Sequence, residues 1–233
     1  MNYKSVIPII PSLNPDNKLI DLVNDLLENE FNKIIVVDDG SKDKDIFNTL
    51  CKNNHVILLT HDVNKGKGEA IKTALTYYKD NLIKDYSGII TMDADGQHLV
   101  VDAINVSNEI VNSNKFTIGT RLFNTKETPL RNKMGNRITS KMFKRLFKVY
   151  LKDTQTGLRG VPNRLIDLHL NTNGSRYEYE MNTLIDLVKS SEEIREVDIK
   201  TVYLENSNKK SHFKPIKDSY RIYKLMFKRK KDD

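Results

Sequence analysis

The chain contains 233 residues, of which 38% are hydrophobic and 30% are charged, so it is polar for a globular protein but too apolar to be disordered. The 38 lysines and arginines exceed the 31 aspartates and glutamates, which gives a net charge of +7. Glycine (10), proline (6) and cysteine (1) are too few for a collagen-like chain, a disulfide framework or a multi-cysteine zinc site. The single cysteine, Cys51, is predicted to be a buried thiol at the end of a helix.

The positive charge indicates an anionic partner, such as a nucleic acid, a nucleotide, a phosphorylated lipid or an anionic membrane surface. Only clustered basic residues count toward such a partner, because Lys, Asn and Ile are abundant throughout the chain. No apolar run approaches the roughly 20 residues of a membrane-spanning helix, and the first ten residues lack a signal-peptide pattern. We therefore expect a soluble or peripheral intracellular protein.

Short apolar runs alternate with amphipathic helical patterns through the first half of the chain. The expected strands cover residues 6–10, 34–37, 56–59, 88–92 and 116–118. The expected helices start near residue 16, follow residue 41, and cover residues 68–84 and 100–111. This alternation predicts a mostly parallel sheet with helices on both faces, in which ligands bind beyond the carboxyl ends of the strands.

The second half of the chain is less regular. We expect a long cationic helix over residues 132–150, a strand near 158–161, a helix near 179–189, a strand near 197–203 and a basic tail over 218–231. No internal repeat and no shift in composition marks a second domain. The prediction is one domain over residues 1–233, made of a first half (1–119), a second half (120–217) and a basic amphipathic tail (218–233).

Two carboxylates stand at the end of the expected strand 88–92, in Asp93-Ala94-Asp95. Such a pair can hold one hard cation, Mg²⁺ or Mn²⁺, and Gln97 and His98 follow closely enough to contribute. The alternative is an Asp-rich turn that caps the next helix. The position at a strand end favours the cation site.

A second acidic cluster, Asp38-Asp39-Gly40-Ser41, follows the expected strand 34–37. Its carboxylates are candidates to bind a base or a ribose, while the alternative is a helix cap. Residues 64–68 read Asn-Lys-Gly-Lys-Gly, which suits a loop that approaches phosphates. The spacing of a P-loop and the glycine fingerprint of dinucleotide-binding proteins are both absent, which argues against kinases, ATPases and dehydrogenases.

Taken in order, these motifs resemble family 2 glycosyltransferases of the GT-A fold, and within them the dolichyl/polyprenyl-phosphate sugar synthase-like branch. The matching segments span nearly the whole chain: VIPIIPSLNP, IIVVDDGS, NKGKGEAIKTAL, ITMDADGQH, IGTR, RNKMGNRITSKMF, DTQTGLRG, YEYEM and SHFKPIKDSYRIY. One departure is Asn14-Pro15, where many members carry Asn-Glu. The resemblance implies a nucleotide-binding sheet, an acceptor-side second half and a basic C-terminal helix.

The resemblance also implies roles for individual residues. The donor nucleotide would be bound by residues from both acidic clusters and the Lys-Gly loop, namely Pro11, Asp38, Asp39, Ser41, Lys65, Gly66, Lys67, Asp93, Ala94 and Asp95. Asp93, Asp95 and Gln97 would hold Mg²⁺ or Mn²⁺ on the donor diphosphate. Arg121 and Arg131 would bind the phosphate of the acceptor, because a guanidinium binds phosphate oxygens in pairs.

The acceptor class decides whether a general base is needed. A polyprenyl phosphate is already anionic, whereas a sugar hydroxyl requires a carboxylate to remove its proton. Asp153 is then the first candidate for this base, and Glu178 and Glu180 are the next candidates. The alternative is that Asp153 only orients its loop.

Two segments, residues 132–150 and 221–231, combine apolar and basic residues, as helices at a membrane interface do. A helix with an apolar stripe facing the core and a solvated basic face gives the same pattern.

Three functions follow from these observations. The first is a metal-dependent inverting transfer of a sugar from a UDP- or GDP-linked donor to a polyprenyl phosphate, at the cytoplasmic face of an anionic membrane, with a membrane protein as a further partner. The second moves the sugar to a hydroxyl of a cell-wall, capsule or other glycan. The third, a nucleic-acid-binding protein, is disfavoured because no binding motif is present and the acidic clusters would repel phosphates.

Overall fold

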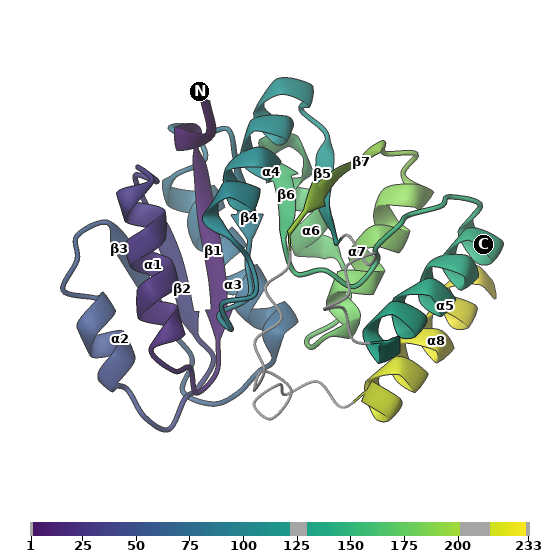
Figure 1. Ribbon diagram of the computed structural model, residues 1–233, viewed down its shortest axis with the longest axis horizontal. Coiled ribbons are helices and arrows are strands. Elements are labelled where there is room, and N and C mark those ends of the chain that lie inside the picture. Colours follow the sequence, from purple (N-terminus) through teal and green to yellow (C-terminus); the bar gives the residue numbers. More distant parts are fainter. Residues whose placement is uncertain (1, 122–129, 201–214, 232–233) are drawn as a thin grey trace.

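The computed structural model describes residues 2–121, 130–200 and 215–231, and only the backbone of residues 130–132 and 215–220. Within these residues a mixed seven-stranded sheet forms the centre, and helices cover both of its faces (Figure 1). This is the layered arrangement that the alternating apolar and amphipathic patterns predicted.

The sheet has the strand order β3-β2-β1-β4-β6-β5-β7. Strands β1, β2, β3 and β4 run parallel, whereas β6 is antiparallel to both β4 and β5, and β7 is parallel to β5. The strands are β1 (Val6–Ser12), β2 (Ile34–Asp38), β3 (Val56–Thr60), β4 (Gly88–Thr91), β5 (Phe116–Arg121), β6 (Arg159–Pro162) and β7 (Ile194–Ile199). All strands except β6 therefore point the same way.

Two separate hydrophobic cores lie on the two faces of the sheet, because successive side chains of a strand point to opposite faces. One core takes Val6 and Ile10 of β1 and is covered by α1 (Lys18–Glu28), α2 (Asp45–Leu50) and α4 (Val100–Ser113). The other takes Ile7 and Ile9. Its helices are α3 (Lys67–Asn81), α5 (Leu130–Phe147), α6 (Ile166–Asn171), α7 (Glu178–Lys189) and α8 (Pro215–Lys231).

The boundaries of several elements differ from the sequence-based expectations. Strand β1 continues through Pro11 to Ser12, because a proline lacks only the amide donor and its neighbours still pair with β2. Strand β7 begins at Ile194, three residues early, and residues 201–203 lie outside the described part.

Cys51 is exposed, so the prediction of a buried thiol was wrong. Leu50 faces the core, and the next residue on a helical path turns about 100° away from it.

Helices α5 and α8 lie side by side at one end of the molecule, at the opposite end from β3 and α2 (Figure 1). The two helices contact each other, and both add buried residues to the same hydrophobic core, including Phe143 of α5 and Met226 of α8. In the described ranges, none of the helices is both long enough and apolar enough to cross a membrane.

Candidate functional site

The candidate site lies along one edge of the sheet. Strands β1, β2, β4 and β5 all end at this edge, and β6 begins there because it runs the opposite way. The residues that follow β2 and β4, the end of β5 and the loop before β6 are therefore neighbours in space. This is the edge at which parallel sheets bind ligands, and it collects most of the predicted site residues.

Asp93 follows β4, and two basic side chains lie beside its carboxylate. Its Oδ1 lies 2.6 Å from the Nζ of Lys67, the first residue of α3, and its Oδ2 lies 3.5 Å from Nε2 of His98. The Lys67 ammonium also contacts Oε1 of Glu180 on α7 at 2.9 Å. Although burial opposes ionisation, the charges of Lys67 and His98 hold the pKa of Asp93 well below its usual range. Asp93 is an anion in this site.

Asp95 lies two residues further on and is exposed, with Oδ1 accepting the backbone N–H of Gln97 at 3.1 Å. Partial desolvation by the surrounding protein and the charge of Asp93 raise the pKa of Asp95. Two carboxylates that repel each other in one turn provide oxygen ligands of the type that Mg²⁺ and Mn²⁺ prefer. Among the described residues, no group of three or more His, Cys, Asp or Glu side chains could hold a metal. The donor set fits a cation that takes its other ligands from a substrate.

His98 is a further polar residue at this turn. Its side chain is buried, and neither ring nitrogen has a hydrogen-bond partner within the described part of the chain; its nearest acidic neighbour is Asp93. A buried polar group without a hydrogen bond is unusual in a folded protein. The sequence placed His98 near the carboxylates, and the structure confirms that position.

The carboxylate of Asp39 supports the loop before α3. Its Oδ1 accepts the N–H of Lys65 and its Oδ2 accepts the N–H of Gly66, both at 2.8 Å, and His61 Nδ1 lies 2.8 Å from Oδ1. Gly66 has a φ of +103°, and a Cβ there would lie 2.5 Å from the carbonyl oxygen of Ser175. These backbone amides bind Asp39, so the loop would approach a phosphate mainly through its lysine side chains.

Asp38 is completely buried and also has structural contacts. Its Oδ1 accepts the N–H of Ser41 at 2.8 Å, and Oδ2 pairs with Nζ of Lys44. The hydroxyl of Ser41 accepts the N–H of Asn14 at 2.8 Å, which ties the end of β1 to the acidic cluster. Pro11 lies beside this cluster in β1, opposite Val37 of β2. The structure thus brings together residues that the sequence selected for a nucleotide site.

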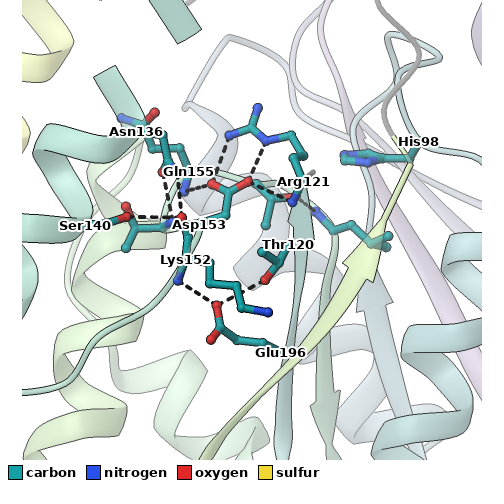
Figure 2. Close-up of polar contacts among 12 residues, drawn as sticks. His98, Thr120, Arg121, Asn136, Ser140, Lys152, Asp153, Gln155 and Glu196 are labelled. Carbon is teal, nitrogen blue, oxygen red and sulfur yellow. Dashed lines mark hydrogen bonds and ion pairs between the residues drawn. The ribbon is translucent and has the colours of Figure 1, made fainter. Parts of the chain in front are cut away.

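Arg121, at the end of β5, forms a two-point ion pair with Asp153 (Figure 2). Its Nε donates to Oδ2 at 2.6 Å and its Nη2 donates to Oδ1 at 3.0 Å. The Asp153 side chain is completely buried, and Oδ1 also accepts the N–H of Gln155 at 2.9 Å. Asp153 therefore orients a guanidinium and is not placed as a base open to substrate.

The loop before β6 connects this ion pair to Asp93. A Cβ on Gly157 would lie 2.2 Å from Oδ2 of Asp93, so a larger residue here would displace that carboxylate or the loop. Arg159 is buried and donates to the carbonyl oxygens of Thr154 and Thr156 in the loop and of Glu180 on α7, and burial lowers its pKa. One short segment thus contacts both halves of the site.

Some residues of the site were not selected from the sequence, and others cannot be placed. The roles of Gly157 and of the Lys67–Glu180 contact have no local signal, because the partners are 64 and 113 positions apart. Glu178, a further candidate for the general base, accepts the N–H groups of Ser175 and Arg176 at the start of α7. Arg131 lies in the first turn of α5, but its side chain is outside the described part.

Comparison with known proteins shows the family and the fold of the chain. A family model described as "Glycosyl transferase family 2" matches residues 8–167. The chain is 35% identical to a UDP-N-acetylglucosamine–dolichyl-phosphate N-acetylglucosaminyltransferase of Methanococcus voltae, over 89% of both chains. It is 29% identical to a dolichyl-phosphate beta-glucosyltransferase of Trichomonas vaginalis, over 53% of this chain and 42% of that one.

A solved structure shows the same fold. The glucosyl-3-phosphoglycerate synthase of Mycobacterium tuberculosis, in complex with Mn²⁺, UDP and glucosyl-3-phosphoglycerate, has a TM-score of 0.71. The match covers 96% of this chain and 79% of that one, at 13% identity. At this identity the likeness shows the fold alone, which is the GT-A fold that the motifs predicted.

Proposed function

The chain belongs to glycosyl transferase family 2 and is a glycosyltransferase, and we propose that it transfers a sugar from a UDP-linked donor to a dolichyl- or polyprenyl-phosphate acceptor. The proposed reaction inverts the anomeric centre, depends on Mg²⁺ or Mn²⁺, and takes place at the cytoplasmic face of an anionic membrane. The observation that carries the proposal is the 35% identity, across 89% of both chains, to an enzyme named for UDP-N-acetylglucosamine and dolichyl phosphate. UDP-N-acetylglucosamine is therefore the first donor to test, ahead of GDP-linked sugars.

The donor would bind at the acidic turn after β4. Asp93, Asp95 and Gln97 would hold the cation, which neutralises charge on the departing nucleoside diphosphate. Lys67 already lies beside Asp93 and adds a second positive charge where the diphosphate would form. Asp39 acts here by holding the loop that carries Lys65 and Lys67.

The burial and the hydrogen bonds of Asp153 favour a phosphate acceptor over a hydroxyl acceptor. A hydroxyl would need a base, but both oxygens of Asp153 accept hydrogen bonds and its side chain is completely buried. Glu180, a further candidate for the general base, forms an ion pair with Lys67. A phosphate needs only charge and hydrogen-bond donors, and a guanidinium held in one plane by a carboxylate suits that role. Arg121, with Arg131, would bind the acceptor phosphate.

An exposed surface on α5 and α8 would face the membrane. It combines large apolar side chains with basic ones, and we call it the basic apolar face: Met134, Ile138, Lys141 and Arg145 on α5, and Phe227, Lys228 and Lys231 on α8. The apolar side chains are well exposed, Met134 to 62% and Phe227 to 52%. Each basic residue near an anionic leaflet contributes about 1 kcal/mol, so attachment would be reversible and sensitive to salt.

The function is tested by a donor and acceptor panel. Purified protein receives UDP-N-acetylglucosamine, UDP-glucose or GDP-mannose, with or without a short polyprenyl phosphate, in Mg²⁺, Mn²⁺ or a chelator. The expected result is transfer from a UDP-sugar that requires both the lipid phosphate and a divalent ion, with inversion seen by NMR of the product. Full activity in the chelator contradicts metal dependence, and transfer only to glycan hydroxyls contradicts the acceptor class.

Membrane attachment is tested with vesicles. The protein should bind vesicles that contain phosphatidylglycerol more tightly than neutral phosphatidylcholine vesicles, and binding should weaken as salt rises. Replacing Met134 and Ile138 by serine should weaken binding, whereas Val101→Ser, at a 52% exposed valine on α4, serves as the matched control. Equal binding to both vesicle types, or equal effects of both changes, contradicts this surface assignment.

A further inference from the structure

Helix α5 buries amide and hydroxyl side chains on the face that contacts the rest of the protein. Asn136, Thr139 and Ser140 are all at most 2% exposed, although this face also carries the apolar residues of the core. Burying an amide is costly unless it makes hydrogen bonds. The bonds of Asn136 go to the loop that joins α5 to β6 (Figure 2).

The amide of Asn136 binds this loop on both sides of Asp153. Its Nδ2 donates to the carbonyl oxygen of Lys152 at 2.7 Å, and its Oδ1 accepts the N–H of Thr154 at 3.2 Å. The two bonds flank one residue, so together they fix the backbone that carries the Asp153 carboxylate. Ser140 adds a longer contact, 3.4 Å, to the same Lys152 carbonyl.

Glu196 on β7 also supports the loop that carries Asp153, from the side opposite Asn136. Oε1 of Glu196 on β7 accepts the N–H of Lys152 at 2.7 Å and the hydroxyl of Thr120 at 3.2 Å (Figure 2). Thr120 directly precedes Arg121 in β5 and Lys152 directly precedes Asp153, so Glu196 joins the strand and the loop one residue before each member of the ion pair. A side chain held from several sides loses little further freedom when it binds a ligand.

We propose that Asn136 is a positioning residue that acts through Asp153 to hold Arg121 in the orientation that binds the acceptor phosphate. This inference rests on the proposed function. Asn136 lies two positions from both Met134 and Ile138, which is about 200° around the helix, so it faces inward while they face outward. One helix thus carries part of the surface proposed to meet the membrane and the amide that sets the position of the phosphate-binding arginine.

The test compares Asn136→Ala with Ser140→Ala, a matched control on the same helix that removes only the long contact to the same carbonyl. Asn136→Ala should lower kcat/KM for the polyprenyl phosphate by about tenfold or more, whereas the Kd of the UDP-sugar stays unchanged. Ser140→Ala should change both by less than about twofold. Equal loss of donor and acceptor affinity in Asn136→Ala overturns the proposal.

A double-mutant cycle with Arg121→Ala separates positioning from a general loss of structure. If Asn136 acts through Arg121, the acceptor effect of Asn136→Ala disappears in the Arg121→Ala background. Additive losses overturn the proposal. Hydrogen exchange gives a readout that needs no acceptor: the amide of Thr154 should lose protection in Asn136→Ala and keep it in Ser140→Ala. If the wild-type protein transfers no sugar to polyprenyl phosphate, the proposed function fails, and unchanged protection of Thr154 independently overturns the positioning role.

Discussion

Protonation of His169, a buried residue of α6, is expected to destabilise the fold as the pH falls below neutral. Its Nδ1 donates to the carbonyl oxygen of Leu165 at 2.9 Å, so Nε2 is the site that gains a proton. In the described part of the chain, Nε2 is buried without a hydrogen-bond partner. Burial lowers the pKa of His169 to about 4, and the nearby charge of Arg159 acts in the same direction. Tyr179 and Glu180 are the other titratable residues around the small cavity that His169 lines.

The size of the effect follows from the difference between the folded and unfolded pKa. The folded value, about 4, lies below the ordinary value of 6.5, so the unfolded chain binds the additional proton first as the pH falls. The free energy of unfolding therefore decreases with decreasing pH through this window. Proton linkage at this one site gives a loss of about 2 kcal/mol between pH 7.5 and pH 5, and about 3 kcal/mol at pH 4.

The assay is urea unfolding of wild-type protein and His169→Asn at pH 7.5 and pH 5. Other groups titrate in both proteins, so the difference between them isolates the histidine: the wild type should lose about 2 kcal/mol more than the variant. Phe116→Leu, beside the same imidazole ring at a centroid distance of 5.6 Å, is the control and should destabilise equally at both pH values. Equal pH dependence in the wild type and His169→Asn, or an NMR titration of His169 above pH 6, would refute the reasoning.

Three further predictions concern the acidic turn. Asp95→Asn should abolish transfer and weaken Mn²⁺ binding measured by calorimetry. Asp43→Asn, at an exposed aspartate in the loop between β2 and α2, is the control and should change neither. Lys67→Gln removes the ammonium 2.6 Å from Asp93, so Mn²⁺ should bind about tenfold more tightly without donor; unchanged or weaker binding contradicts competition at that carboxylate. Gly157→Ala places a Cβ 2.2 Å from Oδ2 of Asp93 and should cost about 1–3 kcal/mol of stability and most activity. A wild-type Tm and kcat in Gly157→Ala would show that the loop moves aside freely.

The local sequence determined the strands, most of the helices and the acidic turns. Apolar runs and helical periodicity depend on neighbouring residues, so β2, β4 and α4 lie within a residue or two of their expected bounds. Parallel strands end at one edge of a sheet, so the residues after β2 and β4 were expected to meet there. The structure confirms that Asp39 and Asp93 lie at this common edge.

The tertiary structure decided what each of those carboxylates contacts. Asp39 was expected to contact a nucleotide, and the structure shows in addition that its oxygens accept backbone N–H groups 26 and 27 positions away. Asp153 was a candidate base, but β6 enters the sheet antiparallel and brings it against Arg121, which buries it in an ion pair. Both outcomes depend on strand order and on contacts between distant segments. A sequence pattern reports the residue types that can do chemistry, but only the packing of strands and loops decides which charges are already paired.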